Sequence, residues 1–208
     1  MLMIYGCKGC GSTVIEAVCE LLGEEYAWRE VEPWTPGPAA DALKALNPLA
    51  QVPTAVLDEG AVMTESVAIL LWLLERHPGT DLAPPPGDPL RPALLRWLVF
   101  FASSLYPMFT VGDYPPRWVK DAEAQAQLKE ASIQRTLACW GMLEQGVQPA
   151  PFLLGERMTV LDVYAAMVSR WRPGRARIRE VAPNVIAAAE RAEAHPVVAR
   201  VFAKNFGG

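Results

Sequence analysis

Hydrophobic and polar positions divide the chain into a first part with mixed strand and helix periodicity and a second part with helix periodicity alone. In the first part, short apolar runs of strand length alternate with stretches in which apolar residues recur every three or four positions. The expected strands cover residues 1–5, 26–31, 54–57 and 61–63, and the expected helices cover 12–22, 39–46 and 65–76. A turn at Gly60 joins the last two strands as a β-hairpin. This order, βαβ, then α, then ββα, predicts a mixed four-stranded sheet with helices packed on it.

Beyond residue 78 the pattern contains no strand signal. Residues 83–89, with the sequence APPPGDP, form a semi-rigid connector. Helical patterns follow near residues 90–105, 117–144, 160–171, 185–194 and 197–204, and prolines separate them. We therefore expect an α/β domain over residues 1–78, a linker over 79–89 and an all-helical domain over 90–208.

The charge balance argues against nucleic acid and membranes as partners. The chain has 208 residues, 51% of them hydrophobic and 20% charged, with a formal net charge of −4. Nucleic acids and anionic membrane surfaces both require a clustered excess of cations, which this composition lacks. The exception is a set of five arginines within residues 170–179. We interpret this segment as a solvated loop between helices, with an anion-binding edge as the alternative.

The chain also lacks signals for export or membrane insertion. Its beginning has no basic segment followed by a long apolar one, and no run of about 18 apolar residues occurs. The cysteines, four in number, are too few for a disulfide scaffold at this length. We therefore expect a cytoplasmic protein with reduced thiols.

The histidines exclude several mechanisms. His77 and His195, the two in the chain, each precede a proline at an expected helix end or start. A Ser-His-Asp hydrolase or a histidine-rich metal centre requires a histidine in a suitable site, and neither position provides one. We therefore expect no catalytic histidine and no bound metal.

A C-x-x-C motif lies between the first strand and the first helix, in residues 6–13 with the sequence GCKGCGST. At such a turn two thiols are close enough to bridge, and the helix N-terminus stabilises a thiolate. Cys10 lies nearest the helix start and gains most from this effect. Ser12 either caps the helix or donates a hydrogen bond to a bound sulfur. The alternative is that Cys7 and Cys10 are two ordinary cysteines in a turn.

A second motif, Val52-Pro53, precedes the hairpin. Proline at a strand entrance cannot donate to a β-ladder, so it belongs at an edge or in a turn. A cis bond between these residues would turn the Val52 backbone toward the C-x-x-C motif and offer its N–H and C=O groups to an extended peptide.

A third motif, Thr64-Glu65-Ser66, begins the next helix. A hydroxyl and free N–H groups there can bind a carboxylate, and Glu65 can pair with a nearby ammonium group. Together they suit the head group of an α-amino acid, with plain helix capping as the alternative. Farther along, Thr159 and Asp162 have the form of a capping box, for which we expect a role in folding.

These motifs, in this order, resemble the cytosolic glutathione transferase superfamily over nearly the whole chain. The strongest signature spans residues 47–69, where the proline-bearing loop precedes the acidic-Ser pair at the spacing of that family. Residues 159–162 resemble the capping box of its helical domain. A cysteine at position 10 resembles bacterial beta- and omega-type members. The resemblance implies a thioredoxin-like N-terminal domain, an all-α C-terminal domain and an activity in detoxification.

The resemblance also implies a role for each site residue. Val52, with Pro53 in cis, would hold the cysteinyl backbone of glutathione, and Glu65 with Ser66 would hold its γ-glutamyl end. Cys10 would lie near the glutathione sulfur, where a cysteine supports thiol transfer through a mixed disulfide better than conjugation. Ser12 is a second candidate for the catalytic role. One departure from the family is Cys7, which displaces the C-x-x-C motif from the usual dithiol site. For the glycine carboxylate of glutathione, the candidates are Lys8, Trp34 and Lys44.

A second pocket, for a small hydrophobic electrophile, should lie between the domains in such a protein. The candidates for its lining are Tyr106, Met108, Phe109 and Tyr114. The resemblance further implies a homodimer.

Three functions therefore follow from the sequence. The leading one is an enzyme in which glutathione thiolate attacks a small electrophile, or in which Cys10 exchanges with a glutathione mixed disulfide. The first alternative is a non-catalytic interaction protein that retains the fold. The second is a redox switch in which Cys7 and Cys10 form a reversible disulfide.

Overall fold

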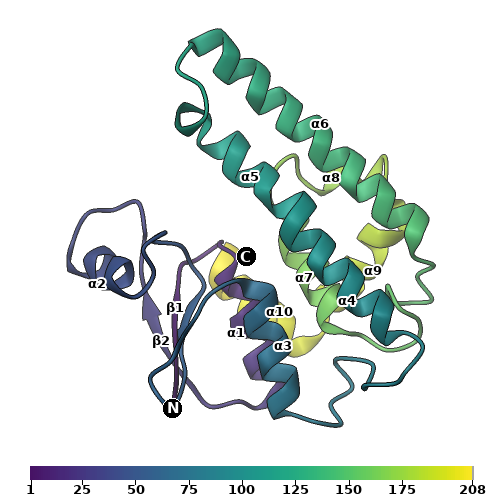
Figure 1. Cartoon of the computed structure of the whole chain (residues 1–208). Coiled ribbons are helices and arrows are strands. Elements are labelled where there is room, and N and C mark those ends of the chain that lie inside the picture. The colour runs from purple at the N-terminus through teal and green to yellow at the C-terminus, as the bar shows by residue number, and fades with distance from the viewer. Residues whose placement is uncertain (208) are drawn as a thin grey trace. The chain divides into compact units, whose positions relative to one another are not determined.

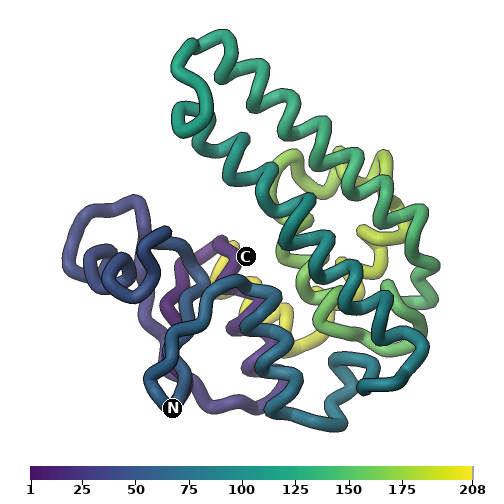
Figure 2. The backbone as a smooth tube through the Cα atoms, in the orientation of Figure 1, coloured from purple at the N-terminus to yellow at the C-terminus, as the bar shows by residue number. Residues whose placement is uncertain are grey.

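The computed structural model describes residues 1–207 and divides the chain into two compact units. The first unit combines Met1–Ala83 with the C-terminal segment that begins at Ala192, and the second unit is Pro84–Arg191. Figure 2 traces the return of the C-terminal segment to the N-terminal unit. The expected helical domain over residues 90–208 therefore differs from the second unit, because the last helix of the chain belongs to the first unit.

The first unit contains the expected mixed sheet. Its strands are β1 (Leu2–Gly6), β2 (Tyr26–Glu30), β3 (Thr54–Val56) and β4 (Val62–Met63). They lie in the order β2-β1-β3-β4. β1 pairs in parallel with β2, and the pairs β1–β3 and β3–β4 are antiparallel. The prediction of a βαβ unit followed by a hairpin is confirmed.

Both faces of this sheet are covered. Residues alternate between the two faces along a strand, so Tyr5 and Ile4 of β1 point in opposite directions. On the Tyr5 face, α2 (Pro38–Leu46) contributes Leu43 to a buried cluster. On the other side, Figure 1 shows α1 (Ser12–Leu22) and α3 (Ser66–Arg76) side by side. The site residues of this unit therefore lie on a sheet held between helices.

The C-terminal helix α10 (Pro196–Phe206) packs against α1 (Figure 1). Glu16 of α1 is almost fully buried, and its carboxylate accepts a hydrogen bond from Asn205 Nδ2 at 2.7 Å and pairs with Lys204. One turn farther along, Arg200 pairs with Glu20 at 2.8 Å. These polar contacts attach the end of the chain to the helix that follows the C-x-x-C motif.

The second unit is all helical and contains a long helix with an internal π-helical turn. α4 (Arg91–Phe100), the π turn η1 (Phe101–Leu105) and α5 (Tyr106–Asp113) are continuous. The sequence predicted an end near residue 105, because a proline normally breaks a helix. Pro107 instead follows the wider π turn, which relieves the clash between its ring and the preceding turn. This part of the prediction was wrong for that reason.

The remaining helices of the second unit are η2 (Pro115–Arg117), α6 (Ala122–Gly146), α7 (Val160–Val168), α8 (Arg175–Arg179) and α9 (Pro183–Glu193). Figure 1 shows α6 running back along α5 and α4. The core contains an aromatic group in which the Phe101 ring lies 5.5 Å from Trp140 and 5.3 Å from Tyr164. In the arginine-rich segment, expected as a loop, Arg175–Arg179 form the short helix α8 and the residues before it form turns. Arg172 and Arg179 pair with acidic side chains.

The continuous helix Arg91–Asp113 is long and apolar enough to cross a membrane by length and composition alone, with a mean hydropathy of 1.4 in its most apolar window. A core helix of a water-soluble domain can pass the same test. Its Leu94, Trp97, Leu98 and Phe101 are buried, and it contacts α6 and α7. In that window 33% of the residues are buried, so one side of the helix belongs to the core of the second unit and the remainder is not buried.

Candidate active site

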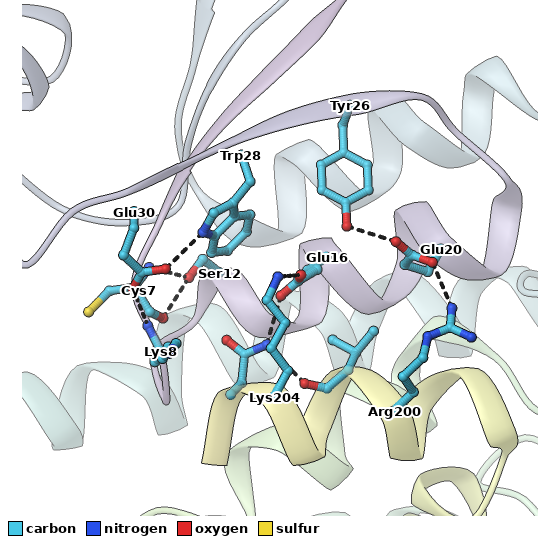
Figure 3. Close-up of polar contacts among 12 residues, drawn as sticks. Cys7, Lys8, Ser12, Glu16, Glu20, Tyr26, Trp28, Glu30, Arg200 and Lys204 are labelled. Carbon is cyan, nitrogen blue, oxygen red and sulfur yellow. Dashed lines mark hydrogen bonds and ion pairs between the residues drawn. The ribbon is translucent and has the colours of Figure 1, made fainter. Parts of the chain in front are cut away.

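The cysteine turn, residues 7–11, connects β1 to α1 and is closed by hydrogen bonds at both ends. The Cys10 N–H donates to the Cys7 carbonyl at 3.2 Å, and the Thr13 N–H donates to the Cys10 carbonyl at 3.0 Å. The Ser12 hydroxyl accepts from the Cys7 N–H at 2.9 Å and donates to the Cys7 carbonyl at 3.1 Å (Figure 3). Gly9 has a φ of +70°, a backbone conformation that favours glycine. The turn is therefore fixed by its own backbone and by Ser12.

Ser12 has a different place from the one expected. It is fully buried, and its one O–H donates to Cys7. The N-cap of α1 is Gly11, without a side-chain cap, so the expectation that Ser12 caps the helix was wrong. Because a hydroxyl has a single hydrogen to donate, a hydrogen bond from Ser12 to a bound sulfur would have to replace the one to the Cys7 carbonyl. Ser12 therefore stabilises the cysteine turn through its two hydrogen bonds to the Cys7 backbone.

The two cysteines of the turn interact through their side chains. Cys7 is buried, and burial together with the nearby Cys10 raises the pKa of its thiol to about 12. Cys10 is partly exposed. Burial raises the pKa of Cys10, a hydrogen bond from Cys7 lowers it, and the negative charge of Glu30 raises it, with a net rise. These surroundings favour a neutral thiol at Cys10, whereas the sequence predicted a thiolate stabilised by the helix N-terminus.

The proline loop, residues 47–53, has the cis Val52–Pro53 bond that the sequence left open. Asn47 holds this loop together: its Nδ2 donates to the Gln51 carbonyl at 3.2 Å and to Thr54 Oγ1 at 3.1 Å. Pro53 is buried, while Val52 is partly exposed. The backbone around Val52 is therefore held in place by Asn47 and Pro53, while the Val52 side chain is partly exposed.

The Glu65 corner, residues 64–66, joins β4 to α3. Glu65 is the N-cap of α3 with a φ of +65° and a ψ of 109°, and it makes no side-chain cap. A residue other than glycine in this region stores about 1–3 kcal/mol of backbone strain, and such residues concentrate at binding sites. The Glu65 side chain is exposed, and Ser66 is partly exposed. The geometry therefore disfavours simple capping by Glu65 and favours a binding role.

The topology of the sheet brings the three segments to the same end of the sheet. β1 ends next to the start of β3, because Tyr5 pairs with Thr54. β4 runs antiparallel to β3 and ends where Met63 pairs with Ala55. The cysteine turn leaves from the end of β1, the proline loop enters β3, and the Glu65 corner leaves from the end of β4. Residues 10, 52 and 65 are thus grouped although more than 50 positions separate the first from the last.

In the second unit, two of the four expected pocket residues belong to one aromatic cluster. The Tyr106 and Phe109 rings lie 6.2 Å apart, edge to face. Both meet Trp171, at 5.2 Å and 5.0 Å between ring centroids. Trp171, which follows α7, was not among the predicted pocket residues, because it carries no local signal beyond being aromatic. Met108 lies on the same helix and is partly exposed.

Tyr114, the fourth expected pocket residue, lies beyond the end of α5. Its ring is stacked by the Arg117 guanidinium, which lies 4.0 Å from the ring centroid. It is 37% exposed, more than the other three candidates. The structure therefore groups Tyr106 and Phe109 with Trp171 and gives Tyr114 a separate contact.

The capping box predicted at the start of α7 is confirmed, with both reciprocal hydrogen bonds present. Asp162 is fully buried and also accepts from the Leu153 N–H at 2.7 Å. Burial raises the pKa of Asp162, while hydrogen bonds from Leu153 and Thr159 act in the opposite direction. Its role is to organise the segment before α7, as expected.

Glu30 contacts the cysteine turn and Trp28 contacts Glu30, and neither was predicted as a site residue. Glu30 Oε1 accepts from the Lys8 N–H at 3.0 Å, and Glu30 Oε2 accepts from Trp28 Nε1 at 2.9 Å (Figure 3). The only signal in the sequence is their alternate spacing on an expected strand, which places them on one face. Within residues 1–207, no group of three or more His, Cys, Asp or Glu side chains could hold a metal ion.

Comparison with known proteins identifies similar chains. The family model described as glutathione S-transferase, N-terminal domain, matches residues 12–76. The chain is 35% identical over 206 residues to the uncharacterized GST-like protein YncG of Escherichia coli strain K12, covering 99% of this chain and 98% of the relative. A glutathione transferase homologue from Sulfitobacter, crystallised with bound glutathione, has a TM-score of 0.84 at 24% identity over 98% of both chains. A glutathione S-transferase from Xanthobacter autotrophicus Py2 has a TM-score of 0.71 at 30% identity over 94% of both chains. These likenesses confirm the expected fold, a thioredoxin-like domain followed by an all-helical one.

Proposed function

This chain belongs to the glutathione S-transferase superfamily, and on that basis we propose that it binds glutathione and transfers the glutathione sulfur to a small hydrophobic electrophile. The observation that carries the proposal is the grouping of the cysteine turn, the proline loop and the Glu65 corner at one end of the sheet. A homologue with this fold was crystallised with bound glutathione, which supports the same ligand here.

Each segment has a chemistry suited to one part of glutathione. The backbone N–H and C=O groups of Val52 can pair with the cysteinyl residue as a short β-bridge. The Glu65 carboxylate, exposed beside the first residues of α3, can bind the ammonium group of the γ-glutamyl end. The hydroxyl of Ser66 and the N–H groups at the start of that helix can bind its carboxylate.

We infer that the Cys10 thiol contacts the glutathione sulfur, because Cys10 lies in the turn between β1 and α1. Because burial and Glu30 raise the pKa of Cys10, its S–H group can donate a hydrogen bond that stabilises a glutathione thiolate. The thiolate then attacks the electrophilic carbon, the new C–S bond forms, and the leaving group departs with its bonding electrons. This favours conjugation over thiol transfer, which requires Cys10 itself as the thiolate.

Two substitutions separate these reactions. Cys10→Ser keeps a hydrogen-bond donor, and we expect conjugation of a chloronitrobenzene to keep most of its rate. Cys10→Ala removes the donor and should slow conjugation by about tenfold, as expected for one hydrogen bond to a charged sulfur. If thiol transfer to a glutathione mixed disulfide is the main reaction instead, both variants lose it completely.

The electrophile requires an apolar surface. We propose that Tyr106, Met108, Phe109 and Trp171 provide it, because three of them form the aromatic cluster described above. Planar aromatic electrophiles suit edge-to-face contacts of this kind. Trp171→Ala should raise KM for the electrophile and leave the affinity for glutathione unchanged.

Calorimetric titration of the reduced protein with glutathione tests the binding function. We expect saturable binding that Glu65→Ala abolishes, because the ammonium group loses its counter-charge. Glu59→Ala, an exposed glutamate in the hairpin turn, is the matched control and should bind as the natural chain does. Absence of binding at millimolar glutathione would overturn the proposal and favour the non-catalytic interaction protein.

We also propose that the protein is a cytoplasmic homodimer. Leu95 and Val99 lie one turn apart on α4 and are 36% and 53% exposed, so they form an apolar stripe that a second copy could cover. Sedimentation velocity should give twice the 22.8 kDa chain mass. The double variant Leu95→Glu/Val99→Glu should sediment as a monomer, while Met142→Glu on α6 should not change the mass. A monomeric natural chain would exclude the dimer.

A further inference from the structure

The edge strand β2 supports the cysteine turn with two side chains from one face. Trp28 and Glu30 alternate along β2, where Trp28 is in register with Ile4 and Glu30 with Gly6. The Trp28 ring fills the space beside Gly6, because a Cβ at that glycine would overlap the ring. β2 therefore contacts β1 at the residue from which the cysteine turn begins.

The Glu30 carboxylate uses one oxygen for the turn and the other for Trp28. Its Oε1 accepts from the Lys8 backbone N–H at 3.0 Å, and its Oε2 accepts from Trp28 Nε1 at 2.9 Å (Figure 3). Lys8 is the residue after the first cysteine of the motif. Hydrogen bonds to an ionised acceptor are stronger than those between neutral groups, so this carboxylate holds the turn in position from outside.

The C-terminal helix holds Trp28 from its other side. Lys204 Nζ lies 5.3 Å from the centroid of the Trp28 ring, within the range of a cation–π contact. The same ammonium group pairs with the buried carboxylate of Glu16 on α1. Trp28 is thus fixed by Gly6, Glu30 and Lys204 together, and the orientation of the Glu30 carboxylate follows from it.

The charged and titratable groups around the cysteine turn and Trp28 come from several elements. They are Cys7 and Lys8 from the turn, Glu30 from β2, Glu32 from the loop that follows, Glu16 from α1 and Lys204 from α10. Glu16 and Lys204 neutralise each other, and Glu32 acts on Cys7. Glu30 is the acidic group whose charge acts on Cys10, where it raises the pKa of the thiol in addition to burial.

We propose that Glu30 is a positioning residue for Cys10: its carboxylate holds the cysteine turn through the Lys8 N–H, two residues before Cys10, and its negative charge acts on the thiol, so that Cys10 acts as an S–H donor. This inference rests on the proposed function, in which the donor stabilises the glutathione thiolate. It assigns to β2 a role in the reaction as well as in the sheet.

The test is the pH profile of Cys10 alkylation by iodoacetamide in the absence of glutathione, followed by mass spectrometry of the peptide that contains residue 10. Glu30→Gln removes the charge and keeps one oxygen for Lys8. We expect the midpoint of the profile to move to lower pH and the rate at pH 7 to rise about threefold, the factor expected for one unit charge acting through partly solvated space. A purely structural role for Glu30 would change the rate without moving the midpoint.

Two further variants complete the design. Glu32→Gln is the matched control: Glu32 is an exposed acid near the turn that accepts from the Thr35 hydroxyl, and its removal should leave the Cys10 midpoint unchanged. Because glutamine has one amide oxygen, Glu30→Gln is also made in a Trp28→Phe background, where no indole N–H competes with Lys8 for it. The downward shift should appear in both backgrounds.

An unchanged midpoint in both Glu30→Gln variants, or an equal shift in Glu32→Gln, would overturn the inference. Because alkylation requires no glutathione, this result is independent of the calorimetric titration. A shifted midpoint in a protein that fails to bind glutathione would contradict the proposed function and leave the action of Glu30 on Cys10 established.

Discussion

Removal of the Asp162 carboxylate should destabilise the second unit more than any other single loss of a helix cap. The fully buried carboxylate accepts from the Leu153 N–H at 2.7 Å, the Thr159 N–H at 2.8 Å and the Thr159 hydroxyl at 2.9 Å. In Asp162→Ala the hydroxyl can rotate to another acceptor, but the two buried N–H groups lose theirs. The loss of stability in this variant therefore depends on the N–H groups of Leu153 and Thr159.

The magnitude follows from these contacts. Each buried N–H without an acceptor costs about 1–3 kcal/mol, so the two together cost about 2–6 kcal/mol. Removal of a buried carboxylate, whose pKa is raised by burial, offsets part of this cost. We expect a loss of about 3 kcal/mol, which lowers the melting temperature by about 6–12 °C in a chain of this size.

The assay is urea unfolding followed by circular dichroism, with hydrogen exchange at the Leu153 amide. Asp162→Asn keeps one carbonyl oxygen and should lose about half as much stability. The control is Asp121→Ala at the exposed N-cap of α6, where a single hydrogen bond of 2.9 Å to the Ala124 N–H is lost, at a cost of about 1 kcal/mol. A loss in Asp162→Ala no larger than in this control, with the Leu153 amide still protected, would show that the two N–H groups do not depend on the Asp162 carboxylate.

Three further predictions concern stability. Burial raises the pKa of Glu24, but hydrogen bonds and charges from His77 and Arg76 lower it by more, so the pKa lies below its usual value. The contribution of Glu24 to the free energy of unfolding is therefore present at neutral pH and is lost as the pH falls through its folded-state pKa. The stability difference between the natural chain and Glu24→Gln in urea titrations should therefore close at acidic pH. Gly146→Ala should lower the melting temperature and shift tryptophan fluorescence, because a Cβ there would overlap the buried Trp97 ring. Lys204→Met should cost about 2 kcal/mol in the same titrations, since it leaves the buried Glu16 carboxylate with less compensation, and Lys204→Arg should restore stability.

Much of the fold was predictable because its signals are local. The helix over residues 12–22 was predicted to end at Gly23, and Gly23 indeed adopts the left-handed conformation that ends helices. The turn at Gly60 and the capping box at residues 159–162 depend on residues a few positions apart, and both were predicted. The grouping of Cys10 with Val52 and Glu65 was implied by the resemblance to the glutathione transferase family, and the pairing of β1, β3 and β4 brings the three segments to one end of the sheet.

Other features depended on contacts that no short segment contains. Pro107 predicted a helix end, but a π turn allows the helix to continue. Ser12 had two expected partners, and the folded turn gave its hydroxyl a third, the Cys7 backbone. The pKa of Cys10 was expected to fall at a helix N-terminus, whereas burial and the charge of Glu30 raise it.

Hydrophobic periodicity, glycine conformations and helix caps act over a few residues, and for that reason most elements and their order could be predicted from the sequence. Three contacts became visible only in the folded chain: the last helix packs on α1, Trp171 meets Tyr106 and Phe109, and Glu30 lies against the cysteine turn. Burial, cross-strand contacts and the field of a neighbouring charge depend on which distant residues become neighbours, and that is known only once the chain has folded.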